Sequence, residues 1–282
     1  MGRVHGVAAA RRWCSQCRAT GQRIGFVPTM GAIHEGHLSL VRLARANADR
    51  VVVSIFVNPL QFGPGEDFER YPRSVAQDRT LLRAERVDLL WEPSVEDLYP
   101  RGESTRVRVE GLEKPMEGAS RPGHFEGVAT VVLKLVNVVV PDTLWLGQKD
   151  AQQARLIERM VEDLALPVRV RRGPTVREPD GLACSSRNRY LERGDRAQAV
   201  ALWQGLAAAR RALEGGERRA ARLERAIRDV WKRYPRVRED YVAVVDAESL
   251  APVRAVRGRV LVAVAARVGG TRLIDNFEWG PQ

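Results

Sequence analysis

The sequence predicts an α/β protein, in which a doubly wound parallel sheet is followed by a second, smaller α+β domain. Short apolar runs alternate with helical patterns up to about Thr175, as they do in parallel sheets. Residues 50–57 are β-branched and almost wholly apolar, which is typical of a parallel strand buried on both faces. After Thr175 the pattern changes to a long loop, two helices and three strands.

The first strand is expected at residues 24–28, and a helix with apolar residues at helical spacing follows from Leu38. Together with the strand at 50–57, they complete a βαβ unit. The alternation then continues. We expect helices at 74–86, 127–139 and 150–164, strands at 87–91, 143–146 and 168–172, then a loop at 177–189, helices at 196–213 and 218–233, and strands at 241–245, 260–265 and 271–276.

The net charge of +11 favours contact with polyanions, but its distribution does not indicate a nucleic-acid surface. Lysine occurs at four positions only, so the excess is arginine spread through the chain, without interleaved aromatic residues for base stacking. We therefore expect no nucleic-acid partner. A basic nucleic-acid-binding protein is the alternative from a different functional class.

The longest apolar run, residues 128–140, is interrupted by Lys134 and Asn137, so we expect no membrane span. The first residues lack the apolar region of a secretory signal, and three cysteines do not make a disulfide framework. A cytoplasmic protein is the simplest interpretation. Cys14 and Cys17 have redox or zinc spacing without a second pair, and inert thiols are the alternative.

The sharpest motif is Pro-Thr-Met-Gly-Ala-Ile-His-Glu-Gly-His at residues 28–37, between the first strand and the first helix. Ligands of such sheets bind beyond the carboxyl ends of the strands, and a helix N-terminus attracts phosphate. Gly31 and Gly36 permit close approach of the backbone, and His34 and His37 fall on one face of the opening turn. The spacing is one residue short of a zinc-protease helix. Two structural histidines remain the other alternative.

This segment resembles the His-x-Gly-His signature of the nucleotidyltransferase superfamily, in the form found in pantothenate synthetases. The likeness extends along nearly the whole chain, through residues 56–62, 71–73, 123–127, 147–150 and 180–188. It implies a Rossmann-like nucleotide- and pantoate-binding domain at 1–175 and a C-terminal α+β lid domain at 176–282. It also implies the ATP-dependent joining of pantoate to β-alanine through a pantoyl-adenylate, with Mg²⁺ as cofactor and a homodimeric assembly.

The resemblance also assigns residues to the site. Expected catalytic residues are His34, His37, Lys149, Ser185, Ser186 and Arg187, and expected ATP-binding residues are Met30, His34, Gly36, His37, Gly147, Lys149, Asp150, Val176, Cys184, Ser185, Ser186 and Arg187. Pantoate and β-alanine are expected at Pro28, Thr29, Met30, Asn58, Gln61, Phe62, Arg121, His124 and Gln153, and Mg²⁺ at Asp78. Gln148, Ala151 and Cys184 depart from the usual Glu, Tyr and Met, which puts the shape of the pocket in doubt.

The residue types suit that chemistry. Lys149 can neutralise charge growing on the α-phosphate, and Asp150 can accept hydrogen bonds from ribose, although a surface ion pair is the alternative. The Ser185-Ser186-Arg187 loop offers donors and a fixed charge for the β- and γ-phosphates, or is a simple polar turn. Amides orient a nucleophilic carboxylate at less cost in reactivity than a cation does. The runner-up function is another nucleotidyltransferase of this fold that forms a dinucleotide.

Overall fold

The computed structural model describes residues 1–280 and separates into two compact units. The first unit comprises residues 1–113, 121–148 and 153–174. The second comprises Lys114–Ser120, Lys149–Gln152 and the chain from Thr175 onward. Two short segments from the first part of the sequence therefore cluster with the C-terminal elements.

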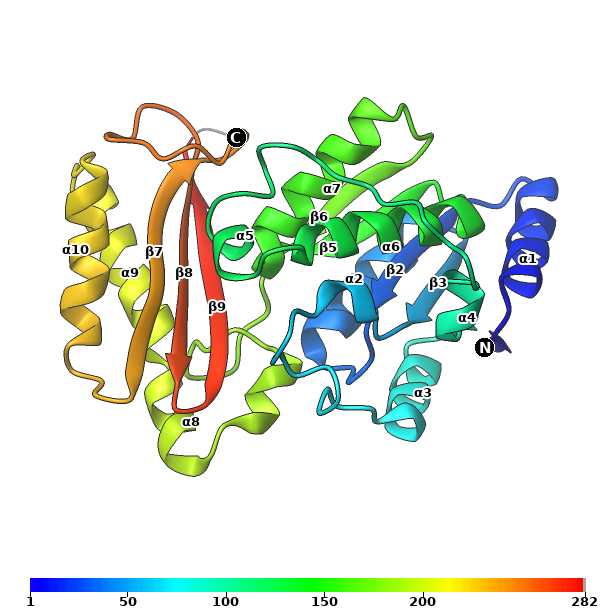
Figure 1. Cartoon of the computed structure of the whole chain (residues 1–282), viewed down its shortest axis with the longest axis horizontal. Helices are drawn as coiled ribbons and strands as arrows, with labels where there is room; N and C mark the ends of the chain where they lie inside the picture. Colours follow the sequence, from blue (N-terminus) through cyan, green and yellow to red (C-terminus); the bar gives the residue numbers. More distant parts are fainter. Residues whose placement is uncertain (281–282) are drawn as a thin grey trace. The chain divides into compact units, whose positions relative to one another are not determined.

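The first unit is built on a parallel sheet in the strand order β1-β4-β3-β2-β5-β6 (Figure 1). From β2 the chain first builds outward to β3 and β4, and β5 then pairs with the other side of β2. The strand order thus reverses between β2 and β5, which is where such folds bind ligands. The strands are β1 (Gly2–Val4), β2 (Ile24–Thr29), β3 (Arg50–Ile55), β4 (Leu89–Trp91), β5 (Thr143–Gly147) and β6 (Arg169–Gly173).

Helices cover this sheet because alternate strand residues are apolar on both faces. Val27, Val51 and Val53 pack against helix α2, whereas Phe26, on the opposite face, is also fully buried. Helices α1 and α6 pack on each other and against β2. The helices of this unit are α1 (Val7–Ala19), α2 (Glu35–Asn47), α3 (Val75–Ala84), α4 (Val95–Leu98), α6 (His124–Val139) and α7 (Ala151–Asp163), the first two residues of α7 clustering with the second unit.

The second unit is an antiparallel sheet, β7 (Val237–Asp246), β8 (Val260–Val268) and β9 (Thr271–Trp279), covered by two helices (Figure 1). Helices α9 (Ala201–Glu214) and α10 (Ala220–Trp231) pack on each other and on the sheet, and enclose an apolar core. Strand β8 pairs along its length with both neighbours, so the sheet is a continuous rigid frame. The short helices α5 (Glu117–Ser120) and α8 (Arg193–Ala199) complete the unit.

The predicted fold class is confirmed, while several boundaries and small elements differ. Strand β1 was not predicted; three residues are too short to show a pattern, and they pair with β4. The single helix expected at 196–213 is two helices, α8 and α9, which meet at Val200. Within residues 1–280, no helix combines the length and apolar character needed to cross a bilayer.

Candidate active site

The start of α2 places His34 and His37 at the carboxyl edge of the parallel sheet. His34 is the N-cap, and its Nδ1 accepts a hydrogen bond from the Gly36 backbone N–H at 3.2 Å. His37 Nδ1 accepts one from the His34 backbone N–H at 3.4 Å, and the ring centroids lie 4.0 Å apart. A ring nitrogen that accepts is unprotonated, so each neutral imidazole carries its proton on Nε2. The opening turn thus presents two ring donors of fixed tautomer.

The loop before these histidines is held by buried polar contacts. Thr29 Oγ1 donates to the Ser54 carbonyl at 2.8 Å and accepts from the Gly31 backbone N–H at 3.1 Å. The Asp78 carboxylate, which is 1% exposed, accepts from the backbone N–H groups of Ala32 and Ile33 at 2.9 and 2.8 Å. These contacts favour a loop-shaping role for Asp78 over direct ligation of a metal.

Three residues predicted to contact pantoate, Met30 after β2 and Asn58 and Gln61 after β3, lie together. Asn58 donates from Nδ2 to Gln61 Oε1 at 3.2 Å, and Gln61 Nε2 lies 2.8 Å from the sulfur of Met30. Asn58 is 1% exposed and Gln61 8% exposed. Asn58 also accepts from the Tyr99 hydroxyl at 2.8 Å, which fixes its amide. These contacts hold the amides in a defined orientation.

Arg121 and His124 lie against the same short helix, η1 (Pro59–Gln61), at its Gln61 end. Both reach the Gln61 backbone carbonyl, His124 from Nδ1 at 2.8 Å and Arg121 at 3.2 Å. His124 Nδ1 must then carry the proton, so Nε2 accepts from Arg121 at 3.1 Å. The two predicted substrate residues therefore support Gln61 through its backbone.

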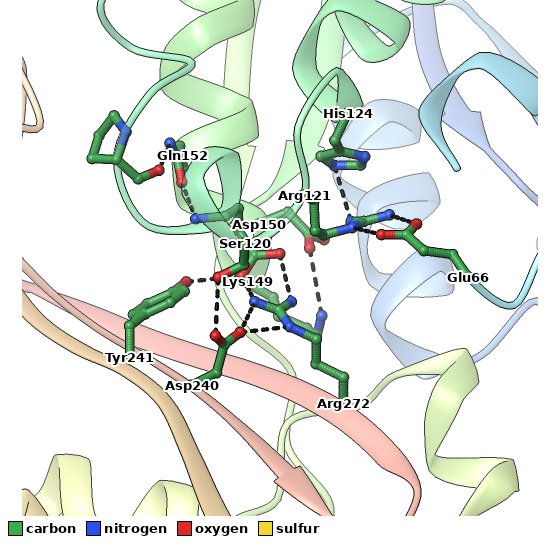
Figure 2. Close-up of polar contacts among 12 residues, drawn as sticks. Glu66, Ser120, Arg121, His124, Lys149, Asp150, Gln152, Asp240, Tyr241 and Arg272 are labelled. Atoms are coloured by element: carbon green, nitrogen blue, oxygen red, sulfur yellow. Dashed lines mark hydrogen bonds and ion pairs between the residues drawn. The ribbon is translucent and has the colours of Figure 1, made fainter. Parts of the chain in front are cut away.

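Glu66 is part of this cluster, although it was not predicted from the sequence. It forms a two-bond ion pair with Arg121, with both distances at 2.7 Å (Figure 2). Burial alone would raise the pKa of Glu66, but the bonds and charge of Arg121 outweigh it and hold that pKa below its ordinary value. No sequence spacing links positions 66 and 121, so only the fold could reveal the pair.

The other residues predicted for the first unit occupy separate places. Gly147 ends β5, which pairs with β2, so both strands end at the same edge of the sheet. Phe62 packs edge-on against Phe68 and Tyr71, with ring centroids 5.3 and 5.9 Å away. Gln153 lies half-buried in the first turn of α7. At Gln148, where the family usually has Glu, the side-chain Oε1 accepts a hydrogen bond from Arg172 at 3.4 Å. Glu158 also pairs with Arg172.

In the second unit, Val176 and Cys184 lie in one hairpin. The Cys184 backbone N–H donates to the Val176 carbonyl at 2.9 Å, and Arg177 pairs with Ala183 as an isolated bridge. Ser185 then caps the short helix η3 (Ser186–Tyr190), and its hydroxyl accepts from the Arg187 backbone N–H at 3.3 Å. The residues between 176 and 187 that were predicted to bind ATP therefore lie in one continuous segment of the chain.

Lys149 is also part of the second unit. Its ammonium lies 3.5 Å from the Asp150 carboxylate, which is the ion pair considered from the sequence. Its backbone carbonyl accepts a 2.7 Å hydrogen bond from the Asn276 side chain on β9. The Lys149 side chain retains 19% exposure, so its charge is partly open to solvent.

Within residues 1–280, Cys14 and Cys17 are buried, Cys184 is half-buried, and none of the three forms a disulfide. Burial raises the pKa of Cys14 to about 12, so it is protonated and unreactive near neutral pH. Over residues 1–280, no group of three or more His, Cys, Asp or Glu side chains is arranged to hold a metal ion. The raised pKa favours the inert-thiol interpretation for Cys14.

Comparison with known proteins identifies the family. A model described as pantoate-beta-alanine ligase matches residues 3–278. A pantothenate synthetase of Thermotoga neapolitana is 53% identical over 97% of this chain and 98% of its own length. A solved pantothenate synthetase of Thermus thermophilus aligns with a TM-score of 0.95 at 48% identity, covering 100% of both chains. The chain belongs to the pantoate–β-alanine ligase family.

A pantoate–β-alanine ligase joins its two substrates at the expense of ATP, and this chain is such an enzyme. The reaction passes through a pantoyl-adenylate and releases AMP and pyrophosphate. The solved ligase of Francisella tularensis, described as complexed with beta-gamma ATP and beta-alanine, covers 98% of this chain at 35% identity and a TM-score of 0.82. The family match decides against the dinucleotide-forming alternative.

Proposed function

We propose that, in this ligase, the residues assembled at the sheet edge bind pantoate and those at the helix start and in the second unit bind ATP. The observation that carries the ATP assignment is the shared tautomer of His34 and His37, whose Nδ1 atoms both accept backbone N–H groups. Two Nε2–H donors at a helix N-terminus suit phosphate oxygens. Lys149 and the Ser185-Ser186-Arg187 segment supply further charge and donors.

The pantoate carboxylate attacks the α-phosphorus of ATP, a new P–O bond forms, and the bond to the bridging oxygen breaks as pyrophosphate leaves. The β-alanine amine then attacks the acyl carbon and expels AMP, losing a proton as the amide forms. Neither step needs a nucleophile from the protein, so catalysis depends on positioning and on stabilisation of charge. Gln61, bonded to Asn58, which Tyr99 and the Gly127 carbonyl hold in place, orients pantoate without a full positive charge.

Magnesium is proposed to enter bound to the phosphates of ATP. Mg²⁺ in nucleotide enzymes commonly keeps water and phosphate ligands and takes few from the protein. Asp78 fits poorly as a direct ligand because both of its oxygens already accept backbone N–H groups in a buried position. When bound, the metal would offset the negative charge of the phosphates.

Two further features complete the proposal. The resemblance to dimeric pantothenate synthetases supports a homodimer. Cys14, Cys17 and Cys184, which form no disulfide in the described part of the chain, agree with a reducing compartment, such as the cytoplasm. Neither feature is needed for the chemistry proposed above.

The role of Lys149 is testable by single-turnover release of pyrophosphate from ATP and pantoate. We expect Lys149→Ala to slow adenylation by about 100-fold or more, the scale of a lost transition-state donor. Lys114→Ala is the matched control, since Lys114 is an exposed lysine of the same unit.

Omitting pantoate, β-alanine, ATP or magnesium in turn from a coupled AMP assay should abolish product in each case. A near-normal adenylation rate in Lys149→Ala would refute the catalytic role of that lysine. AMP formation that does not need pantoate would refute the proposed order of steps.

A further inference from the structure

Strand β9 contacts the Lys149 segment at the residue proposed to act on phosphate. Asn276 is 5% exposed, and its side-chain Nδ2 donates to the Lys149 backbone carbonyl at 2.7 Å. Asn276 pairs in register with Ala263 of β8, inside a sheet that is paired along its length. The lysine backbone is thereby bonded to a rigid element of the same unit.

The same face of β9 reaches the other end of this segment. Arg272 lies four residues before Asn276, so strand alternation places both on one face. Arg272 donates to both oxygens of Glu117 at 2.7 Å, and also to Asp240 (Figure 2). The Gln152 side chain accepts from the Glu117 backbone N–H at 3.1 Å and donates to the Pro115 carbonyl at 2.8 Å (Figure 2). Residues 149–152 are thus tied to β9 at both ends.

The opposite face of β9 holds the hairpin that precedes Ser185. Asp275 is 2% exposed and pairs with both terminal nitrogens of Arg177, at 2.6 and 3.0 Å. Arg177 also donates to the Gly181 carbonyl at 3.0 Å and lies over the Trp203 ring at 4.0 Å. Burial raises the pKa of the Asp275 carboxyl, and the Arg177 charge opposes that rise. A pair this buried fixes the hairpin because breaking it leaves an uncompensated charge.

We propose that β9 is the positioning strand of this ligase: Asn276 sets the place of Lys149, and Asp275 sets the place of the Val176–Cys184 hairpin and of the serines that follow. The proposal rests on the phosphate-binding roles proposed above. Two adjacent side chains on opposite faces of one strand fix the spacing between the two phosphate-binding segments. Neither residue needs to touch a substrate, so both are positioning residues. A displacement of about 1 Å is enough to cost about 100-fold in rate.

The Asn276 bond is tested by comparing Asn276→Ala, Lys149→Ala and the double variant in the single-turnover assay. Asn276→Ala should slow adenylation by about 10- to 100-fold, with the KM for pantoate unchanged. If Asn276 acts through Lys149, its removal costs nothing further in Lys149→Ala, so the double variant should match Lys149→Ala alone. Glu278→Gln is the control, since it removes a 2.9 Å ion pair with Arg259 from the same strand.

The outcomes separate this proposal from the one on which it rests. A near-normal adenylation rate in Lys149→Ala would refute the catalytic role of Lys149, and it would refute the positioning role of Asn276 as well. A slow Lys149→Ala with a normal Asn276→Ala, or losses that multiply in the double variant, overturns the positioning role alone. Circular dichroism verifies folding. Asn276→Leu, which keeps the volume and removes the donor, gives the same comparison if the alanine variant does not fold.

The contact between Asp275 and Arg177 is tested separately, through the KM for ATP. Asp275→Asn keeps the shape of the side chain and removes the charge that holds Arg177. We expect the KM for ATP to rise by about 10-fold while the KM for pantoate stays constant, because the displaced hairpin carries donors proposed for the nucleotide. An unchanged KM for ATP in the folded variant would overturn this half of the proposal.

Discussion

At the scale of single residues, Asp78 gives the loop before His34 its conformation. Gly31 and Ala32 both have left-handed backbone angles, with φ of 82° and 49°. Such a conformation is strained for alanine, and surrounding contacts must hold it. The Asp78 carboxylate supplies two of them, to the N–H groups of Ala32 and Ile33. One buried carboxylate thus determines where the histidine turn begins.

Replacing Asp78 by Asn should therefore destabilise the fold, with or without magnesium. An amide offers one acceptor in place of two and turns its NH₂ group toward a backbone N–H. We expect Asp78→Asn to lower the free energy of unfolding by about 1–3 kcal/mol, the cost of a buried unsatisfied group. Urea unfolding with and without MgCl₂ measures the change.

Asp163→Asn is the control for this variant, because its side chain is 59% exposed and its loss should change the stability by less than about 0.5 kcal/mol. If Asp78 ligated the metal directly, magnesium would stabilise the wild-type protein and leave Asp78→Asn unchanged. If Asp78→Asn is less stable to unfolding than the wild type only when MgCl₂ is present, Asp78 is a ligand of the metal.

At the scale of elements, helix α6 and the short helix η1 meet at a glycine. A Cβ atom on Gly127 would lie 2.3 Å from the Leu60 carbonyl oxygen, closer than any real contact, and the obstructing atom belongs to the backbone. The Gly127 carbonyl also accepts from Asn58 Nδ2 at 3.1 Å. Close approach of the two backbones is therefore what places the Asn58 and Gln61 amides.

Gly127→Ala should push η1 away from α6 and disturb both amides. We expect a loss of stability of about 1–3 kcal/mol, as for other overpacked positions, together with a raised KM for pantoate and a smaller change for ATP. Gly258→Ala is the control, since nothing lies within 4 Å of the added carbon. Thermal unfolding and steady-state kinetics measure both effects. A variant with normal stability and a normal KM for pantoate would show that the contact does not position the amides.

The sequence predicted the elements that repeat a pattern and missed those that depend on distant partners. The strand-turn-helix unit at residues 24–47 was visible because apolar spacing and the glycines are local signals. The Arg121–Glu66 pair and the Asn276–Lys149 contact join residues 55 and 127 positions apart, respectively. No local pattern marks such pairs, so their discovery required the fold.

At the scale of the whole chain, several motifs in the right order predicted the family and its reaction. They did not predict which segments of the chain belong to which of the two units. Lys114–Ser120 and Lys149–Gln152 cluster with the C-terminal elements, although the alternating strands and helices continue around them. Their membership reflects contacts with β9, such as Asn276 with the Lys149 carbonyl and Arg272 with Glu117. Sequence periodicity records which face of an element is apolar, and it does not record which element lies opposite.

The charge of +11 also belongs to the whole chain, and it is the excess of 46 Lys and Arg over 35 Asp and Glu, many of which lie beside one another. Arg228 pairs with Glu224 and Glu239, and Arg196 pairs with Glu178 and Asp180. A guanidinium already paired to carboxylates contributes less to a field that attracts polyanions. Paired arginines such as these are therefore a poor basis for a nucleic-acid-binding surface.

Binding of a single-stranded RNA, measured by fluorescence anisotropy at two salt concentrations, should accordingly be weak. We expect a Kd in the non-specific range of about 10⁻⁶ to 10⁻⁴ M near physiological salt. Addition of ATP distinguishes the source of any signal, because RNA phosphates held at the nucleotide site are displaced and those held elsewhere are not. A nanomolar Kd with a steep salt dependence, unaffected by ATP, would instead establish a dedicated phosphate-tracking surface, which the paired arginines argue against.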